Sequence, residues 1–349
     1  MATYAAADLE RAAGALFERA GLAPEIAAAV AETLVSADLM GFDTHGLRFC
    51  PAYVKDIETG AAAKAGTPTV LKERPGALTL DGGRLPGPWV LAWAIAEAET
   101  RLSGAATVAC AIRNARNAGC LVTYARKAAL AGRMLLLTAS APTNAAVAPF
   151  GGREARLATN PFAAGIPAEP HPIVFDTSAA AVTNRMTERA RDAGAKLPGP
   201  YVVGADGRPS DDPAALFGPP KGAILSAGGL DQGYKGYAFG LLTEMLASGL
   251  AGTGRNDPDA AGQSLFFLLI DPDAFGGAEA LSSSATHLAE WCRSSAPMQG
   301  FDAVRVPGDR AAASRARQLA DGVTLAPDIL PGLLPLLERY GVPAPAPLG

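Results

Sequence analysis

The chain has 349 residues, of which 49% are hydrophobic and 18% charged, and 30 Lys and Arg against 34 Asp and Glu give a net charge of −4 at pH 7. The length suits about two domains, and this charge balance argues against a nucleic-acid-binding protein, which carries a basic surplus on one face. No apolar run reaches the roughly 20 residues that cross a bilayer, and the N-terminus lacks the basic-then-apolar order of a signal peptide.

The N-terminal third predicts a helical cap. Apolar residues at spacings of three and four indicate a helix over Ala7–Ala20, and a second helix is predicted over Pro24–Met40. A polar break, Asp43–Gly46, precedes a third predicted helix at Pro51–Glu58. The tail, Asp309–Tyr340, is again helical in pattern, and we expect it to pack against the N-terminal helices.

From about residue 67 the pattern becomes that of strands. Val70–Thr79 is interrupted by Pro75-Gly76 in the manner of a hairpin. Four further apolar runs, each bounded by Gly, Pro, Asn or Asp, are typical of buried strands: Ala105–Ile112, Met134–Ala139, Ile173–Asp176 and Leu265–Ile270. Helices are predicted between some of these strands, at Trp89–Leu102, Gly119–Ala131 and Tyr237–Gly249. The stretch 180–229 is rich in Gly, Pro and Asp and predicts a small irregular insertion or a small lobe.

Few residues in the chain can bind a metal or transfer a proton. The four cysteines form no CxxC pair and no cluster with histidine, which argues against a metal site and predicts free thiols in a cytoplasmic protein. Of only three histidines, His171 lies between two prolines and His287 in a polar helix, so both are predicted to be solvated. His45 lies in the polar break, where a group with a pKa near 7 suits a general acid. The alternative is a helix N-cap formed by Thr44.

Two other polar residues are candidates for anion binding. Arg48 shares a helical face with His45, and its planar guanidinium suits a carboxylate. Lys235 lies between Gly233 and Gly236 at a predicted helix start, which suits a phosphate or carboxylate, the alternative being an ordinary turn with a solvated lysine. The usual dinucleotide, phosphate-loop and nucleophile-elbow motifs (GxGxxG after a strand, GxxxxGK[ST] and GxSxG) are absent.

In combination and in this order, the segments of the chain resemble the malate/L-lactate dehydrogenase-like family of NAD(P)-dependent oxidoreductases, which is unrelated to the Rossmann lactate and malate dehydrogenases. The family also contains ureidoglycolate, sulfolactate and diketogulonate dehydrogenases and piperideine- and pyrroline-2-carboxylate reductases. The motifs that carry the resemblance are Gly41–Gly46 (family pattern G-x-D-S-H-G), Arg48, Tyr53, Gly60, Val147–Gly152, Thr159–Pro161, Phe175–Thr177, Gly233–Tyr237 and Val306–Asp309.

The resemblance implies an α/β fold with a non-Rossmann cofactor domain, built on a largely antiparallel mixed sheet, and a helical cap formed by the N- and C-terminal segments. We assign residues 1–66 and 305–349 to the cap on the substrate side. Residues 67–179 and 230–304 form the NAD(P)-binding domain, and 180–229 the insertion. The resemblance also implies a homodimer.

The resemblance further implies roles for individual residues. His45 donates a proton to the substrate, with Thr44 in place of the family serine as relay. Arg48 binds the substrate carboxylate, and Thr159 lies near the substrate. The residues that match dinucleotide-binding segments of the family are Asn117, Ala118, Gly119, Asp176, Thr177, Ser178, Tyr234, Lys235, Asp271, Pro272, Gly276 and Gly277.

One departure from the family pattern affects the chemistry. The family carries N-S-N-H-F-G where this chain has Asn114–Gly119, so that Asn117 replaces a histidine that contacts the cofactor or serves as acid in some members. Asparagine can form hydrogen bonds but cannot titrate. The neighbouring Arg116 suits a 2′-phosphate or a second substrate carboxylate, or is simply solvated.

These features predict hydride transfer between NAD or NADP and C2 of a small carboxylate, most simply a 2-oxo acid/2-hydroxy acid pair. The alternatives are a reductase of a cyclic 2-imino acid, which needs less acid catalysis and so fits Asn117, and a catalytically degenerate dinucleotide-binding paralogue.

Overall fold

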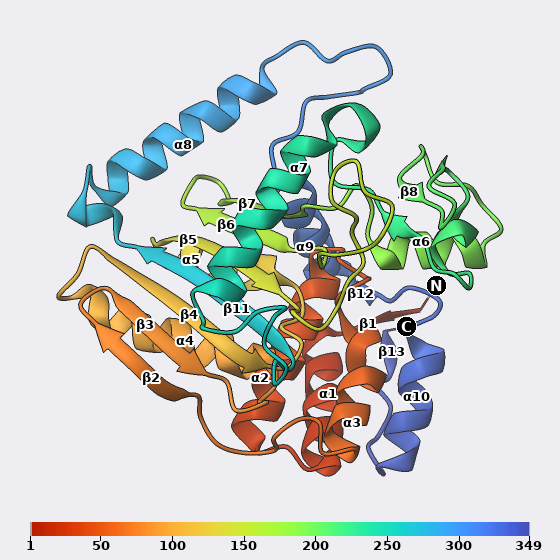
Figure 1. Cartoon of the computed structure of the whole chain (residues 1–349). Helices are drawn as coiled ribbons and strands as arrows, with labels where there is room; N and C mark the ends of the chain where they lie inside the picture. Colours follow the sequence, from red (N-terminus) through yellow and green to blue (C-terminus); the bar gives the residue numbers. More distant parts are fainter. Residues whose placement is uncertain (1, 349) are drawn as a thin grey trace.

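A seven-stranded sheet forms the centre of the structure, a computed structural model that describes residues 2–348 (Figure 1). The strand order is β2-β3-β4-β11-β5-β6-β7, and only the β3–β4 pairing is parallel. The strands are β2 (Thr69–Arg74), β3 (Ala77–Asp81), β4 (Thr107–Ala115), β11 (Gln263–Ile270), β5 (Met134–Ser140), β6 (Pro161–Ile166) and β7 (Ile173–Ser178). This mixed, largely antiparallel sheet confirms the predicted non-Rossmann α/β fold.

Helices cover both faces of this sheet. On one face α4 (Gly87–Leu102) packs on β4, and α5 (Leu121–Leu130) packs on β5 and β6. On the other face α7 (Gly229–Glu244) crosses in front of the sheet and continues into a π-helical turn at Met245–Gly249 (Figure 1). The central strand β11 reads QSLFFLLI and buries Leu265, Phe267 and Leu269, as expected for a strand with neighbours on both sides.

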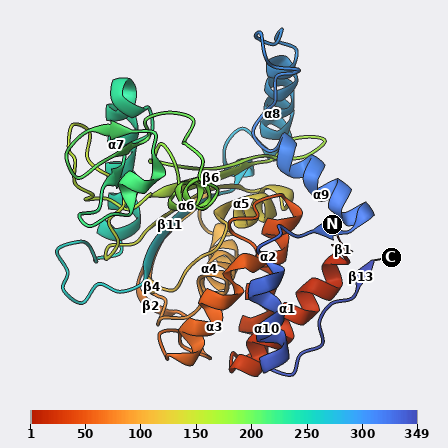
Figure 2. The same cartoon turned by 90° about the vertical axis from the view of Figure 1, so that its right-hand side faces the viewer.

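The cap is built from both ends of the chain. Its helices are α1 (Ala6–Ala20), α2 (Pro24–Leu39), α3 (Cys50–Glu58), α9 (Asp309–Asp321) and α10 (Leu330–Arg339). A small sheet, β12-β1-β13, joins the termini, where Thr3 of β1 (Thr3–Tyr4) pairs with Thr324 of β12 (Val323–Thr324) and Leu348 of β13 (Pro347–Leu348) (Figure 2). The buried side chains of α1 and α2 belong to the same apolar core as those of β11, so the cap is fixed against the sheet.

The segment 180–229 forms a small lobe, which is one of the two alternatives predicted from the sequence, and its apolar cluster also includes Val147 and Leu157. It contains α6 (Asn184–Asp192), a 3₁₀ turn at Pro213–Leu216, and a sheet of β8 (Val202–Val203), β9 (Pro209–Ser210) and β10 (Ala223–Ile224). Val182, Leu197 and Val202 are buried in an apolar cluster separate from the main core. The sequence did not predict the strands of this segment, because each is only two residues long and lies in a Gly- and Pro-rich stretch.

Helix α7 differs from the sequence prediction in where it begins, and helix α8 differs from the other helices in its placement. Helix α7 begins at Gly229, eight residues before the predicted Tyr237, because its glycines pack closely on neighbouring side chains and backbone rather than breaking the helix. Helix α8 (Ala278–Arg293) projects away from the body of the molecule in both views (Figures 1 and 2). Within residues 2–348, no helix combines the length and apolar character needed to cross a membrane.

Candidate active site

His45 lies in a loop between α2 and a 3₁₀ turn at Leu47–Phe49 that leads into α3. Its Nδ1 is 2.8 Å from the Thr44 hydroxyl oxygen, so the two residues predicted to act together are in hydrogen-bond contact. The ring lies beside Phe49, with 5.7 Å between ring centroids. Burial lowers the pKa of His45, and the nearby Asp43 carboxylate opposes this shift. The imidazole is therefore neutral at pH 7, and its Nε2 makes no hydrogen bond to any described residue.

A buried aspartate beneath this loop was not identified from the sequence. Asp38, in the last turn of α2, accepts a hydrogen bond from the Leu47 amide at 2.8 Å. A Cβ at position 46 would overlap the Asp38 carboxylate, so only glycine fits there. Burial raises the pKa of Asp38 to about 7. The signal available in the sequence was an acidic residue placed between the apolar Ala37 and Leu39 at the end of a largely apolar helix.

Arg48 presents unused hydrogen-bond donors. Its side chain is only 15% exposed, and Nη2 forms an ion pair with Asp328, which precedes α10. Nε and Nη1 are buried and have no hydrogen-bond partner among the described residues. Buried donors of a guanidinium without a partner are energetically unfavourable. Arg48 therefore suits a carboxylate ligand, whereas Asp328 is a contact that the sequence did not predict.

The segment that contains Asn117 is held tightly from several sides. Tyr53 of α3 donates to the Asn117 carbonyl oxygen at 2.7 Å, and the Asn117 side chain accepts from the Gly119 amide at 2.8 Å. The Ala118 amide donates to Gln263 at 2.9 Å. Asn117 thus shapes its own turn, as asparagine side chains commonly do.

Arg116 makes an ion pair within the chain. Its Nε and Nη2 donate to one carboxylate oxygen of Asp56 in α3, at 2.9 and 2.6 Å. None of the three possibilities considered from the sequence, a 2′-phosphate, a second substrate carboxylate or simple solvation, describes this contact. The pair was not predictable because its partners lie 60 residues apart.

The end of β7 lies against the start of α5. The Asp176 carboxylate accepts from the Leu121 amide at 3.1 Å, and burial raises the pKa of Asp176 to about 6. Thr177 is exposed and Ser178 half-buried. Phe42 packs on a buried cluster formed by Ala37, Met40, Cys120, Val122, Val174 and Ala311, which joins the His45 loop to this junction. The structure therefore brings the predicted catalytic loop close to two of the predicted cofactor segments, 117–119 and 176–178.

Thr159 is placed at the same end of the sheet. Its carbonyl oxygen accepts from the Ala179 amide at 3.0 Å, directly after Ser178. The next residue, Asn160, has a φ of 48° and is buried, and its side chain donates to the Gly240 carbonyl and to Glu244, both at 2.9 Å. This buried contact with α7 fixes the turn that carries Thr159.

The glycines around Lys235 have a packing role. A Cβ at position 233 would lie 3.0 Å from the Phe150 ring, and one at position 240 would lie 3.2 Å from the Ala179 side chain. Gly236 lies directly on the backbone of Ala227. Lys235 is in the second turn of α7 rather than at its start; it is exposed, as is Tyr234, and makes no ion pair with any described residue. Lys235 is thus available to an anion, but not as part of a glycine cradle.

The loop 271–277 lies at the opposite end of the sheet. In the register of β11 and β4, Gln263 pairs with Ala115 and Ile270 with Thr107. A strand of this length spans about 25 Å, so Asp271, Pro272, Gly276 and Gly277 are far from the Asn117 segment of the same chain. Asp271 forms an ion pair with Arg133 at 2.6 Å. One chain alone does not bring all of the predicted cofactor residues together.

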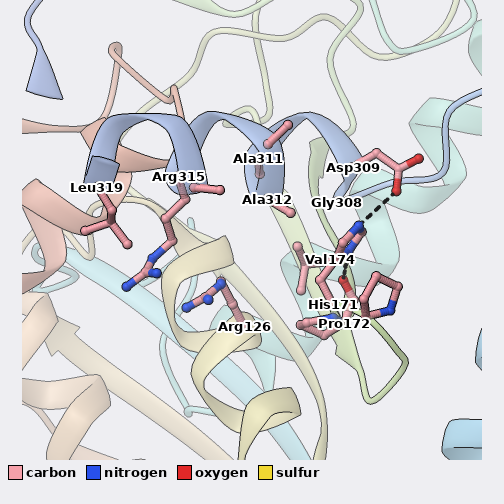
Figure 3. A pocket seen from close by; sticks show the side chains of 13 residues that line it. Arg126, His171, Pro172, Val174, Gly308, Asp309, Ala311, Ala312, Arg315 and Leu319 are labelled. Atoms are coloured by element: carbon pink, nitrogen blue, oxygen red, sulfur yellow. Dashed lines mark hydrogen bonds and ion pairs between the residues drawn. The ribbon is translucent and has the colours of Figure 1, made fainter. Parts of the chain in front are cut away.

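The other two histidines lie outside this site. His287 is exposed on α8, as predicted. His171 is half-buried, contrary to the prediction, because its Nε2 lies 3.3 Å from the Asp309 carboxylate. It lines a cavity of about 540 Å³ between α5 and α9, together with Arg126 and Arg315 (Figure 3). The residues that the structure describes contain no group of three or more His, Cys, Asp or Glu side chains that could hold a metal ion.

Comparison with known protein families matches residues 4–333 to the family described as malate/L-lactate dehydrogenase. The chain belongs to this family. A similar member is the L-lactate dehydrogenase of Cupriavidus necator, which is 32% identical over 333 residues, covering 92% of this chain and 93% of that protein. The Delta(1)-pyrroline-2-carboxylate/Delta(1)-piperideine-2-carboxylate reductase of Pseudomonas putida is 29% identical and is matched over 95% of both chains.

Solved structures of the malate/L-lactate dehydrogenase family show the same fold. A malate/lactate dehydrogenase from E. coli superposes with a TM-score of 0.88 at 26% identity, over 98% of this chain and 96% of that chain. The members thus include enzymes that act on hydroxy acids and enzymes that reduce cyclic imines, which are the two activities predicted from the sequence.

Proposed function

We propose that this member of the malate/L-lactate dehydrogenase family transfers hydride between NAD(P)H and C2 of a 2-oxo acid/2-hydroxy acid pair, with Thr44, His45 and Arg48 as its substrate-side residues. The observation that carries the proposal is the Thr44–His45 hydrogen bond, three residues from an arginine with two buried, unused donors. Proton transfer and carboxylate binding are the two tasks that the substrate side of such a reaction requires.

The chemistry divides between these residues. Arg48 binds the substrate carboxylate through Nε and Nη1, which orients C2. The free Nε2 of His45 gives a proton to the substrate oxygen during reduction or takes one during oxidation, while Thr44 holds the other ring nitrogen. The nicotinamide of NAD or NADP, the cofactor of this family, supplies or accepts the hydride.

The cofactor would be held mainly by side chains. The amides of Ala118, Gly119 and Leu121 already donate to side-chain oxygens of the same chain, so they do not form a free phosphate cradle. Exposed Thr177 and Lys235 remain available, and Ala179, two residues after Thr177, contacts α7 at Gly240. Lys235 is suited to the negative charge of the pyrophosphate.

The first test is NADH and NADPH oxidation by the purified protein. The substrates are pyruvate, oxaloacetate, longer 2-oxo acids, sulfopyruvate, and piperideine- and pyrroline-2-carboxylate. We expect turnover with at least one 2-oxo acid. His45→Gln should lower turnover by about 100-fold or more while leaving dinucleotide binding nearly unchanged. Wild-type-like rates in this variant would remove His45 from the mechanism.

Reduction of a cyclic 2-imino acid is the second candidate activity. The asparagine at position 117 favours it, because Asn117 cannot titrate and its side chain is occupied by the Gly119 amide. A cyclic imine can arrive with its nitrogen already protonated, so less acid catalysis is needed. Turnover confined to the two imines would assign this activity. Tight NAD(P)H binding without turnover of any panel member would instead favour the degenerate paralogue.

We also propose that the protein is a cytoplasmic homodimer. Exposed large apolar side chains gather on α7 and its π-helical turn (Leu241, Leu242, Met245, Leu250) and on α8 and its flanking segments (Phe275, Leu288, Trp291, Met298, Phe301). Apolar surface of this extent is typical of protein interfaces. A second copy could also bring its loop 271–277 to the cofactor site, which the same chain cannot do. Four free cysteines fit a reducing compartment.

A further inference from the structure

One ion pair links the 180–229 lobe to the loop that carries His45. Arg189 of α6 donates from Nη2 to Asp43 Oδ2 at 2.7 Å and from Nη1 to Oδ1 at 3.3 Å. Within residues 2–348, no other hydrogen bond or salt bridge connects this lobe to the cap segments 1–66 and 305–349. The apolar cluster of the lobe extends to Val147 and Leu157 but includes no residue of the cap, so among the described residues this ion pair is the polar contact between lobe and cap.

Asp43 is two residues before His45, so the pair also affects the charge at the site. Arg189 balances Asp43, and Arg48 is balanced by Asp328, whose carboxylate also acts on Arg189. The other four charged residues of α6 pair among themselves, Arg185 with Glu188 and Arg191 with Asp192. From beneath the loop, the buried Asp38 contributes little charge below neutral pH. With both bridges formed, each carboxylate beside the His45 loop has a guanidinium partner that offsets its charge, and Asp43 retains an influence on the imidazole.

We propose that Arg189 is a positioning residue that acts through Asp43, holding the α6 lobe against the His45 loop and cancelling the negative charge beside the imidazole. The catalytic part of this inference rests on the proposed function. An opposite charge favours the charged form of a titrating group, and its removal has the reverse effect. Loss of Arg189 would leave Asp43 uncompensated and favour the imidazolium, whereas loss of the Asp43 charge would disfavour it.

The test compares two single substitutions that break the same bridge. In Arg189→Met we expect the pKa of His45 to rise, and in Asp43→Asn to fall, each by roughly half to one unit. The double variant D43N/R189M should return it close to the wild-type value. Both singles and the double variant should raise the substrate KM several-fold, because all three lose the link between lobe and loop. Lys196→Met, which breaks the Lys196–Asp211 pair at 3.0 Å in the same lobe, is the matched control.

Two readouts separate this inference from the proposed function. The acid limb of the pH–rate profile follows His45 during catalysis, and a ¹H–¹⁵N NMR titration follows it without any substrate. With only three histidines in the chain, the His45→Gln spectrum assigns the signal. Opposite NMR shifts in the two single variants support the charge role even if no panel substrate turns over. Shifts in the same direction, or none, would show that the bridge is only structural, and an unchanged KM in an active enzyme would overturn the positioning role.

Discussion

Gly46 and Asp38 show how one buried carboxylate determines the shape of the catalytic loop. Asp38 accepts from the Leu47 amide, and the loop passes so close that a Cβ at position 46 would overlap the carboxylate. The glycine after His45 is therefore required by its contact with Asp38, since its φ of −93° is accessible to any residue. The position of the imidazole thus depends on a buried residue of α2 that lies beneath the loop.

Gly46→Ala tests this dependence. The added methyl group must displace either Asp38 or the loop, so we expect a loss of about 1–3 kcal/mol in the free energy of unfolding. Turnover should fall more than this stability loss explains, because His45 moves with the loop. Chemical denaturation and steady-state kinetics measure the two effects. Gly60→Ala is the control for stability. The added methyl group has open space there, so it displaces no neighbour, and any loss of stability comes from the positive φ of Gly60. A fully active G46A protein would contradict the packing argument.

The lowered pKa of His45 predicts a directional pH dependence. Oxidation of a 2-hydroxy acid needs the neutral imidazole, which is present at pH 7 because burial lowers the pKa of His45 below its ordinary value near 6.5. We expect the oxidation rate to be maximal at and above neutral pH and to fall as the pH drops through this pKa. Reduction needs the imidazolium and should show the reverse profile. Initial rates in both directions between pH 5 and 9 measure it. Identical profiles would show that another group titrates.

The sequence predicted Thr44, His45 and Arg48 as candidate site residues, but not the distant residues that contact this loop. His45, Thr44 and Arg48 are close together in the chain, so their spacing alone indicated a shared site, and the Thr44–His45 hydrogen bond agrees with it. Asp328 and Arg189 could not be predicted, because each reaches the loop from a segment more than a hundred residues away. Pairing at such separation depends on the tertiary fold, which local periodicity does not report.

At the level of elements, the end of β7 and the start of α5 stabilise one another. The Asp176 carboxylate binds the first amide of α5, where unpaired backbone donors and the positive end of the helix dipole favour a negative charge. The resemblance indicated Asp176 as a cofactor residue, and the geometry gives it a structural contact as well. Burial raises the pKa of Asp176 to about 6, so ionisation of this carboxyl group is less favourable in the folded protein than in the unfolded chain.

Asp176→Asn tests how the raised pKa of Asp176 affects the free energy of unfolding. The folded protein keeps a proton on Asp176 that the unfolded chain releases near pH 4, so this contribution to stability is present below pH 4 and lost as the pH rises through about 6. The variant has no carboxylate to ionise at this position, so it does not lose this contribution. Relative to wild type, its free energy of unfolding should therefore increase by up to about 3 kcal/mol as the pH rises from 4 to 7. Urea denaturation at several pH values measures the difference. A pH-independent difference would contradict the raised pKa.

Strands and most helices were predicted because their patterns are local. The hairpin at Pro75-Gly76 became β2 and β3, and the predicted helix at Trp89–Leu102 became α4. The start of helix α7 was predicted too late, because glycines that normally break a helix here allow close packing on neighbouring residues. Composition alone cannot distinguish a glycine in a turn from a glycine in a tight contact.

At the scale of the whole molecule, the proposed dimer would account both for an exposed apolar surface on α8 and for the distance of the loop 271–277 from the other predicted cofactor residues. Trp291 is 69% exposed on α8, a helix that projects from the body, although its sequence was predicted to be polar and solvated (Figure 2). The loop 271–277 precedes this helix and lies at the end of the sheet remote from His45. A twofold dimer would bury the apolar side chains and could carry this loop to the partner's cofactor site.

Replacing one apolar residue of α8 by a charged one tests the dimer. We expect the wild-type protein to sediment at twice the 35.4 kDa mass of the chain. Trp291→Asp should shift it toward the monomer, because an unpaired charge at the centre of an apolar interface typically costs several kcal/mol. Leu334→Asp, at a 41% exposed site on α10 of the cap, should remain dimeric. If the partner's loop completes the cofactor site, the monomeric variant should also bind NAD(P)H more weakly, with its helical content unchanged. A monomeric wild-type protein would exclude the proposed assembly, and unchanged cofactor affinity in a monomeric W291D protein would show that each chain binds the dinucleotide alone.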